Sequence, residues 1–191
     1  MRALVILHPG FEEIEAVTPM DLLSRAGVDI IAASTGSQRT VTGRSGITIE
    51  ADVLLTKEVS LEVYDAVLLP GGPGIKALRG HPLVCDLLRR QAASGRWVAC
   101  ICAAPLLLYD AGLLKNHSRY TCHPSAEEEL PGNAEKTPSV IEGNILTSQG
   151  AGTAADFAFA LIDKLFGLST AEDIAASICS PSGVAAGSVK S

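Results

Sequence analysis

The sequence predicts a parallel α/β fold in which helices cover both faces of a central sheet. Short apolar runs alternate along the chain with segments of helical periodicity, a pattern typical of successive βα units. The apolar runs lack polar alternation, as in ALVIL at 3–7, so both faces of these strands should be covered. Together these observations indicate three layers: helices, sheet and helices.

The N-terminal elements follow this pattern. The strand at 3–7 leads into a helix within 12–27. Four apolar residues give this segment its helical spacing: Ile14, Val17, Leu22 and Leu23. Pro19 interrupts the pattern, so the helix either kinks there or restarts with Thr18 as its N-cap.

The middle of the chain departs from strict βα alternation. A second strand is expected at 28–34, and residues 38–56 alternate apolar and polar side chains among several glycines. That alternation favours a hairpin over another βα unit. A strand ending in a glycine turn follows at 64–72, and an amphipathic helix at 82–95 ends at Gly95.

The C-terminal half returns to the βα pattern. An apolar strand at 97–101 leads into a helix at 104–111. A polar, loop-rich interval follows, and then a hairpin is predicted at 139–148 and a helix at 155–167.

Length and composition limit the number of domains and the partners. A chain of 191 residues with no linker or repeat predicts one domain over 1–180, and the small residues of 181–191 predict a disordered tail. The net charge is −6 and no lysine or arginine run occurs, so neither nucleic acid nor an anionic membrane is an expected partner. The N-terminal apolar stretch is too short for a signal peptide or a membrane span, and we expect a cytoplasmic protein.

Five cysteines occur without the spacing of a metal site. Cys100 and Cys102 form a C-x-C pair, but no second cluster accompanies it. We therefore expect free thiols in a reducing compartment, with no bound metal and no cofactor. Most of these cysteines should pack like small apolar side chains.

Cys102, at the carboxyl end of a predicted strand, has two interpretations. A cysteine at a strand end is most often a small core residue. Here a helix follows directly, Ala103 and Ala104 permit a tight turn of the kind that carries nucleophiles, and Pro105 suits a first helical turn. Backbone N–H groups at the helix start would lower the pKa of the thiol. We therefore predict that Cys102 is a nucleophile.

The PGGPG turn also lies at a strand end, where parallel sheets bind ligands. Its residues Gly72, Gly74 and Ala77 fit the loose dinucleotide fingerprint. However, the turn does not follow the first strand, and no acidic residue ends the next strand to bind a ribose. The backbone N–H groups of Gly72 and Ala103 are instead predicted to form an oxyanion hole near Cys102.

Three glutamates and one histidine are the remaining candidates for the site. Glu12 and Glu13 are interpreted as favourable partners of a helix N-terminus. Glu15 is the glutamate placed to point inward. His123, isolated in YTCHPS, is by itself more often a loop residue than a base.

Five segments are distinctive in combination: RALVILHPGFEEIEAVTPMDLLSRAG, AVLLPGG, ICAAP, TCHP and ILTSQGAGT. Together they resemble the ThiJ/PfpI superfamily, in particular its Parkinson-associated deglycase (Park7-like) branch, from about residue 2 to residue 178. The resemblance implies a flavodoxin-like fold and a homodimer. The site residues that it implies are Cys102 as reactive thiol, Glu15 as its protonated hydrogen-bonding partner, Gly72 and Ala103 as oxyanion donors, His123 nearby and Arg44 as an anion contact.

The sequence departs from that pattern in two places. Gln149 and Ala151 stand where the branch usually has Arg and Pro, which removes one positive charge near the pocket or the dimer seam and weakens the case for anionic ligands. Ala103 follows the cysteine where the protease-like branch has His. A Cys-His dyad of neighbouring residues is therefore absent, and peptidase activity is disfavoured.

Three functions compete. The first is a cofactor-independent glyoxalase or protein deglycase that protects against oxidative stress, in which Cys102 adds to methylglyoxal-type 2-oxoaldehydes or their adducts and Glu15 transfers a proton. The second is a redox sensor or chaperone in which Cys102 is oxidised. The third, thiazole monophosphate (thiamine) biosynthesis, is a label often attached to this family, and no phosphate loop in the sequence supports it.

Overall fold

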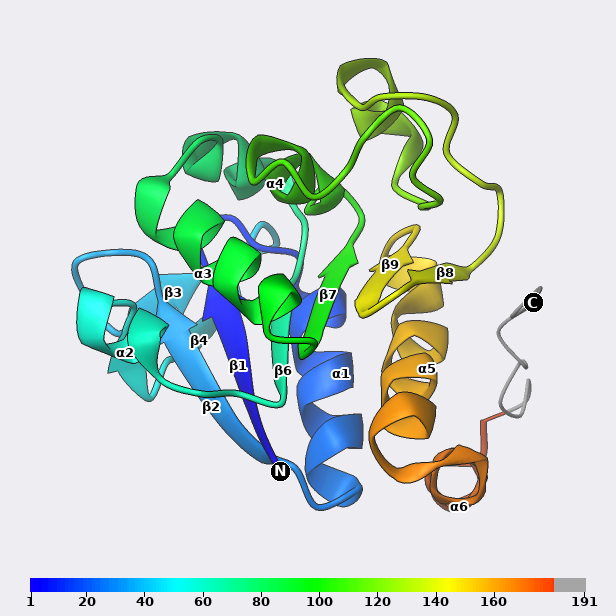
Figure 1. The fold of residues 1–191 in the computed structure, drawn as a ribbon. Helices are drawn as coiled ribbons and strands as arrows, with labels where there is room; N and C mark the ends of the chain where they lie inside the picture. The colour runs from blue at the N-terminus through cyan, green and yellow to red at the C-terminus, as the bar shows by residue number, and fades with distance from the viewer. Residues whose placement is uncertain (181–191) are drawn as a thin grey trace.

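The computed structural model describes residues 1–180, so the predicted disordered tail at 181–191 lies outside the described residues (Figure 1). One seven-stranded sheet forms its centre, with the strand order β5-β2-β1-β6-β7-β9-β8. In chain order the strands are β1 (Arg2–Leu7), β2 (Asp29–Ser34), β5 (Val53–Leu54), β6 (Ala66–Leu69), β7 (Trp97–Ile101), β8 (Ser139–Glu142) and β9 (Ile145–Ser148). All neighbours pair in parallel except β8 and β9, which form the predicted antiparallel hairpin.

The predicted covering of both sheet faces is confirmed by β1. Ala3, Val5 and Leu7 belong to one buried apolar cluster, and Leu4 and Ile6 belong to another. Successive side chains of a strand point to opposite faces, so an uninterrupted apolar strand requires apolar contacts on both. This explains why its sequence shows no polar alternation.

Helices cover the two faces separately (Figure 1). One face carries α1 (Glu13–Arg25), α5 (Ala154–Phe166) and α6 (Leu168–Ser177), and the other carries α3 (Pro82–Ala93) and α4 (Pro105–Asp110). Short elements complete the described chain: α2 (Lys57–Leu61) and the 3₁₀ helices η1 (Pro73–Leu78), η2 (Pro124–Glu129) and η3 (Ala151–Thr153). The expected α/β fold is therefore confirmed.

The strand order locates the place where a site should form. Without the edge strands β5 and β8, the parallel order is β2-β1-β6-β7-β9, which is the flavodoxin-like order. The connections leave in opposite directions from β1 and β6, and ligands in such sheets bind at the carboxyl ends of the strands beside this switch point. The turns after β1, β6 and β7 meet there.

The predicted hairpin at 38–56 is confirmed as β3 (Thr40–Thr42) and β4 (Thr48–Glu50), a separate antiparallel pair. The chain then adds β5 to the sheet edge and continues into α2, so a short βα unit follows the hairpin. The sequence pattern predicted neither this unit nor α6. Both are short and carry few bulky apolar side chains.

Helix α1 differs in two ways from the sequence pattern. It continues through Pro19 with neither a break nor a restart at Thr18, and the Pro19 ring is buried. Ile14 and Val17, which contributed to the apolar spacing, are 53% and 46% exposed. The buried residues of the helix are Glu13, Glu15, Ala16, Pro19, Leu22 and Leu23.

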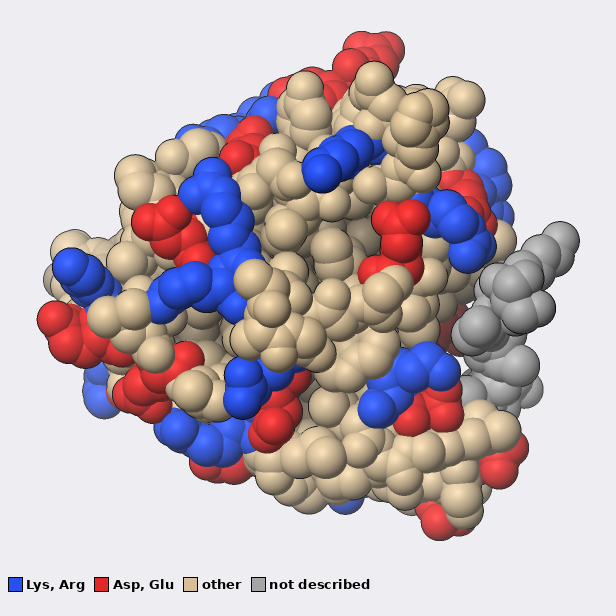
Figure 2. Space-filling model, in the orientation of Figure 1, with Lys and Arg blue, Asp and Glu red and all other residues tan. Residues whose placement is uncertain are grey.

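The face of the described residues shown in Figure 2 has no large area of a single charge. Basic and acidic side chains are interspersed over the face shown in Figure 2, and several of them form ion pairs. Among residues 1–180, no helix is long and apolar enough to cross a membrane.

Candidate active site

The backbone at Cys102 forms a sharp turn between β7 and α4. Its φ is +66°, a left-handed conformation that is uncommon for a residue with a side chain. The Cys102 N–H donates to Ser148 O at 2.9 Å, and its carbonyl accepts from the His123 N–H at 2.9 Å. Neighbouring segments therefore hold the turn in place, as at the strained turns that present nucleophiles.

Glu15 reaches the same point from the first turn of α1. Its side chain is 2% exposed, and Oε2 accepts the Gly71 N–H at 2.8 Å. Its carboxyl and the Cys102 thiol interact as hydrogen-bonding partners. The inward orientation predicted for Glu15 is thus present.

Gly71 makes this approach possible because it lacks a side chain. A Cβ at Gly71 would lie 2.6 Å from Cys102 Cβ, 2.9 Å from the Ala103 nitrogen and 2.9 Å from Glu15 Oε2. All three contacts are shorter than packed atoms tolerate. The sequence pattern predicted a role for Gly72, the second glycine of the GG pair, but none for Gly71.

Burial dominates the protonation of the pair. It raises the pKa of Glu15 to about 7, although the Cys102 and Gly71 donors act in the opposite direction. Burial and the neighbouring Glu15 charge raise the pKa of Cys102 to about 12, partly offset by the N–H groups of Gly72 and Ala103. The lowered pKa expected for Cys102 is therefore wrong, because desolvation outweighs the donors at the turn.

The two groups act as one titrating unit. Near neutral pH the pair holds one or two protons, and the single-proton form has two tautomers: thiol with carboxylate, and thiolate with carboxylic acid. The second tautomer is the arrangement that the family resemblance implied. Moving one proton across the hydrogen bond interconverts them.

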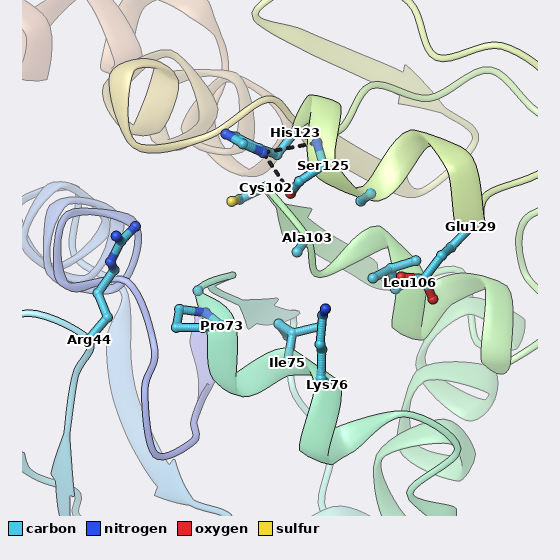
Figure 3. Close-up of a pocket in the computed structure, with 12 residues that line it drawn as sticks. Arg44, Pro73, Ile75, Lys76, Cys102, Ala103, Leu106, His123, Ser125 and Glu129 are labelled. Atoms are coloured by element: carbon cyan, nitrogen blue, oxygen red, sulfur yellow. Dashed lines mark hydrogen bonds between the residues drawn. The ribbon is translucent and has the colours of Figure 1, made fainter.

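A cavity of about 300 Å³ opens beside the thiol (Figure 3). Five of the predicted site residues line it: Cys102, Gly72, Ala103, His123 and Arg44. Glu15 is not among the residues that line it. The sequence analysis missed the other lining residues, which are Pro73, Ile75, Lys76, Leu106, Ser125, Ala126 and Glu129.

The hydrogen bonds of His123 determine its tautomer. Its Nδ1 accepts the Ser125 N–H at 3.2 Å and contacts Ser125 Oγ at 2.9 Å (Figure 3). A nitrogen that accepts from a backbone N–H carries no proton, so the neutral ring is protonated at Nε2. In this state His123 can offer a donor to a substrate oxygen.

A family model matches residues 1–164 under the description DJ-1/PfpI family. The chain belongs to the DJ-1/PfpI family.

Relatives in this family match nearly the whole chain. Protein dj-1beta of Drosophila melanogaster is 37% identical over 177 residues, covering 91% of this chain and 94% of the relative. A protein of Caenorhabditis elegans named glutathione-independent glyoxalase DJR-1.2 is 32% identical over 181 residues, covering 93% and 95%. Oxidized DJ-1 of Toxoplasma gondii has a TM-score of 0.87 at 32% identity, covering 93% of this chain and 97% of that structure.

Arg44 lies at the cavity on the turn of the β3–β4 hairpin. Its Nη1 is 3.2 Å from Glu12 Oε2, so an acidic neighbour already compensates part of its charge. The turn is held by Glu13, whose Oε1 accepts the Ser45 N–H at 2.7 Å. A Cβ at Gly43 would overlap the Glu13 carboxylate. Glu13 thus anchors the turn, a role beyond that of a helix-end partner.

The loop at 149–151, where this chain departs from the family pattern at two positions, also borders the site. Gln149 and Ala151 are not among the residues that line the cavity. Gly150 lies between them, and a Cβ there would be 3.7 Å from Glu15 Oε1 and 3.5 Å from His123 Cδ2. The two replacements therefore flank a glycine that lies beside Glu15 and His123.

His8 is a buried residue that the sequence analysis missed. Its Nδ1 and Nε2 each lie 3.3 Å from a carbonyl oxygen, of Pro9 and Pro70 respectively. Burial lowers its pKa, although these carbonyls act in the opposite direction. The ring joins the turn after β1 to the turn that carries the glycine donors. In the sequence, the only hint of this role of His8 is the proline that follows it, Pro9.

Metal ligation finds no support around this centre. Within residues 1–180, no three His, Cys, Asp or Glu side chains are grouped so that they could hold a metal ion.

Proposed function

We propose that this protein converts small 2-oxoaldehydes such as methylglyoxal into 2-hydroxy acids without a cofactor, and that it acts on related protein adducts. The observation that carries this proposal is the buried Cys102–Glu15 pair at the wall of a cavity. The name of the C. elegans relative, a glutathione-independent glyoxalase, supports the same reaction class.

The reaction begins with addition of the thiol to the aldehyde. The Cys102 sulfur bonds to the aldehyde carbon while its proton passes to Glu15. Glu15 then gives this proton to the aldehyde oxygen, which yields a hemithioacetal and leaves Glu15 as a carboxylate. The N–H groups of Gly72 and Ala103 lie at the sulfur, where negative charge is concentrated before addition. His123 Nε2–H is the candidate donor to the substrate oxygens.

Glu15 then moves a proton between adjacent carbons. Its carboxylate removes the hydrogen of the hemithioacetal carbon while the ketone oxygen takes up a proton, which gives an enediol. Its carboxylic acid then returns a proton to the neighbouring carbon, and the hydroxyl on the sulfur-bearing carbon loses its proton. The result is a thioester of lactate on Cys102. Water cleaves it, releasing lactate and the thiol, so one methylglyoxal and one water give one lactate with no net oxidation.

The test follows lactate formed from methylglyoxal by wild-type protein, Glu15→Gln and Cys102→Ala. Glu15→Gln keeps a hydrogen-bonding amide beside the sulfur but removes the base. Lactate formation should fall by about 10²-fold or more, the usual scale of acid–base catalysis, while the thiol still reacts with iodoacetamide. Cys102→Ala should abolish turnover. Unimpaired turnover in Glu15→Gln would remove Glu15 from the mechanism.

Redox sensing is the second candidate, and one feature favours it. The carboxyl of Glu15 and the N–H groups of Gly72 and Ala103 converge on the Cys102 sulfur. These donors would bind the oxygens of a sulfinate after oxidation by a peroxide. Intact mass after limited peroxide treatment tests it: a gain of two oxygens on Cys102 before any other thiol is expected. A sensor is modified once, whereas a glyoxalase consumes many equivalents of aldehyde.

A homodimer is proposed as the working assembly. Ile14 and Val17 form an exposed apolar strip on α1, and Ile47, 56% exposed, lies on the hairpin turn anchored to the same helix. Exposed apolar side chains gathered in one region are typical of a protein–protein contact. The family resemblance likewise implied a homodimer.

A further inference from the structure

Lys76 is a cavity residue that the mechanism above does not use. It lies on η1 and lines the cavity together with Cys102, and its side chain points into the space below Ala103 (Figure 3). Within residues 1–180, its ammonium group forms no ion pair within 4.0 Å and no hydrogen bond.

The other charges at the cavity already have partners. Arg44 pairs with Glu12. Glu129, the acidic residue in the lining, accepts from Arg79 Nη1 at 2.5 Å, and Arg79 also forms a two-point contact with Asp110. Lys76 is therefore the lining cation whose charge no described neighbour compensates.

The cavity is larger than methylglyoxal requires. At roughly 30 Å³ per non-hydrogen atom, the value for liquid water, the five such atoms of methylglyoxal occupy about 150 Å³. The cavity measures about 300 Å³. At the same value of about 30 Å³ per atom, the remaining space would hold about five further atoms. Those atoms would extend from the thiol into the space that Lys76 borders.

We propose that Lys76 is a specificity-determining residue that binds the carboxylate of an acidic 2-oxoaldehyde while its aldehyde carbon lies at Cys102. The inference rests on the proposed function, because it assigns a substrate class to the same cavity. A single ammonium suits one monovalent carboxylate better than a phosphate, which favours several donors or the fork of an arginine. The anion contact is thereby assigned to Lys76 and not to Arg44, because Glu12 already compensates part of the charge of Arg44.

A suitable probe is 4,5-dioxopentanoate, which carries the aldehyde and ketone of methylglyoxal on a chain ending in a carboxylate. With one water it would give 2-hydroxyglutarate, just as methylglyoxal gives lactate. Its methyl ester has nearly the same shape without the charge. Comparing kcat/KM for the acid, the ester and methylglyoxal isolates the contribution of the carboxylate.

Lys76→Met should lower the ratio of kcat/KM for the acid to kcat/KM for the ester by about three- to fivefold through KM, the scale of an exposed ion pair. Lys76→Arg should retain the preference. Lys57→Met, which removes an exposed charge outside this cavity, is the matched control and should behave like wild type. Equal losses for acid and ester, or equal losses in both lysine variants, would overturn the proposal.

Thiol labelling separates this proposal from the glyoxalase activity. The alkylation rate of Cys102 is measured with iodoacetate, which is anionic, and with iodoacetamide, which is neutral. Lys76→Met should lower the iodoacetate-to-iodoacetamide rate ratio by a similar factor, and Lys57→Met should not. An unchanged ratio contradicts the anion site even if turnover is observed. A changed ratio without methylglyoxal turnover would retain the anion site and reject the glyoxalase.

Discussion

The thiol of Cys102 sits on a backbone conformation that suits glycine better than cysteine. A left-handed φ brings Cβ close to the following carbonyl and costs roughly 1–2 kcal/mol for a residue with a side chain. The structure keeps the residue there through hydrogen bonds to Ser148 and His123. Reactivity at this position therefore comes with a local loss of stability.

We predict that Cys102→Gly is more stable than Cys102→Ala by about 1 kcal/mol. Both variants remove the sulfur, but only glycine relieves the strain at φ +66°. The free energy of unfolding in urea measures the difference. If the alanine variant is equally or more stable, the turn is not strained.

The pair of Cys102 and Glu15 makes stability depend on pH in an unusual direction for a carboxyl group. The folded state keeps the Glu15 proton up to a pKa of about 7, whereas the ordinary value is 4.5. Between these values the unfolded chain ionises freely and the folded chain does not. The contribution of Glu15 is therefore fully present below pH 4.5 and is lost as the pH rises through about 7.

We predict that wild type loses up to about 3 kcal/mol relative to Glu15→Gln between pH 4.5 and pH 7.5. Glutamine has no proton to release, so subtracting its unfolding free energies removes the effects of other groups. Urea denaturation at several pH values gives the comparison. A difference that grows with pH in favour of wild type would mean that the folded pKa of Glu15 is lowered instead.

At the level of residues, the sequence predicted those site residues that lie directly after a predicted strand. Cys102 and Gly72 lie at strand ends, and such positions can be found without a structure. Gly71 and Lys76 could not be found in this way, because their roles depend on which atoms approach them from other turns. The direction of the Cys102 pKa depends likewise on burial, which local sequence does not show.

At the level of elements, long apolar patterns were predictable and short ones were not. Strands β1, β6 and β7 are continuous apolar runs, and α5 has strong helical spacing. Strand β5 has two residues and exists because β2 offers it an edge. Proline in the middle of a helix costs about 3 kcal/mol, yet α1 tolerates it where burial of the ring offsets part of that cost.

The hairpin turn depends on Glu13, and this dependence is testable. We predict that Glu13→Ala speeds hydrogen exchange at the Ser45 N–H by tenfold or more, because the carboxylate that accepts this proton is lost. Glu12→Ala is the matched control, since Glu12 contacts only the Arg44 side chain of this turn. Equal exchange rates in both variants would show that β3 and β4 hold the turn unaided.

At the level of the whole molecule, the exposed strip on α1 predicts self-association. Light scattering at micromolar concentration should give twice the chain mass of 19.8 kDa. Ile14→Glu should give the mass of one chain, because a charge would be buried in the contact. Val63→Glu changes an equally exposed apolar residue outside α1 and should leave the dimer intact. A single-chain mass for wild type would reject the dimer.

The site draws its parts from turns far apart in the chain, and this governs how activity returns after denaturation. Glu15, Gly71, Cys102 and His123 each follow a different strand or loop, so none of their contacts forms before the central strands have paired. Closing such long loops is the slow step in folding. We predict that, on dilution from urea, lactate formation from methylglyoxal recovers only with the slowest phase, after helical circular dichroism has returned. Simultaneous recovery of both signals would mean that residues 1–180 fold in a single step.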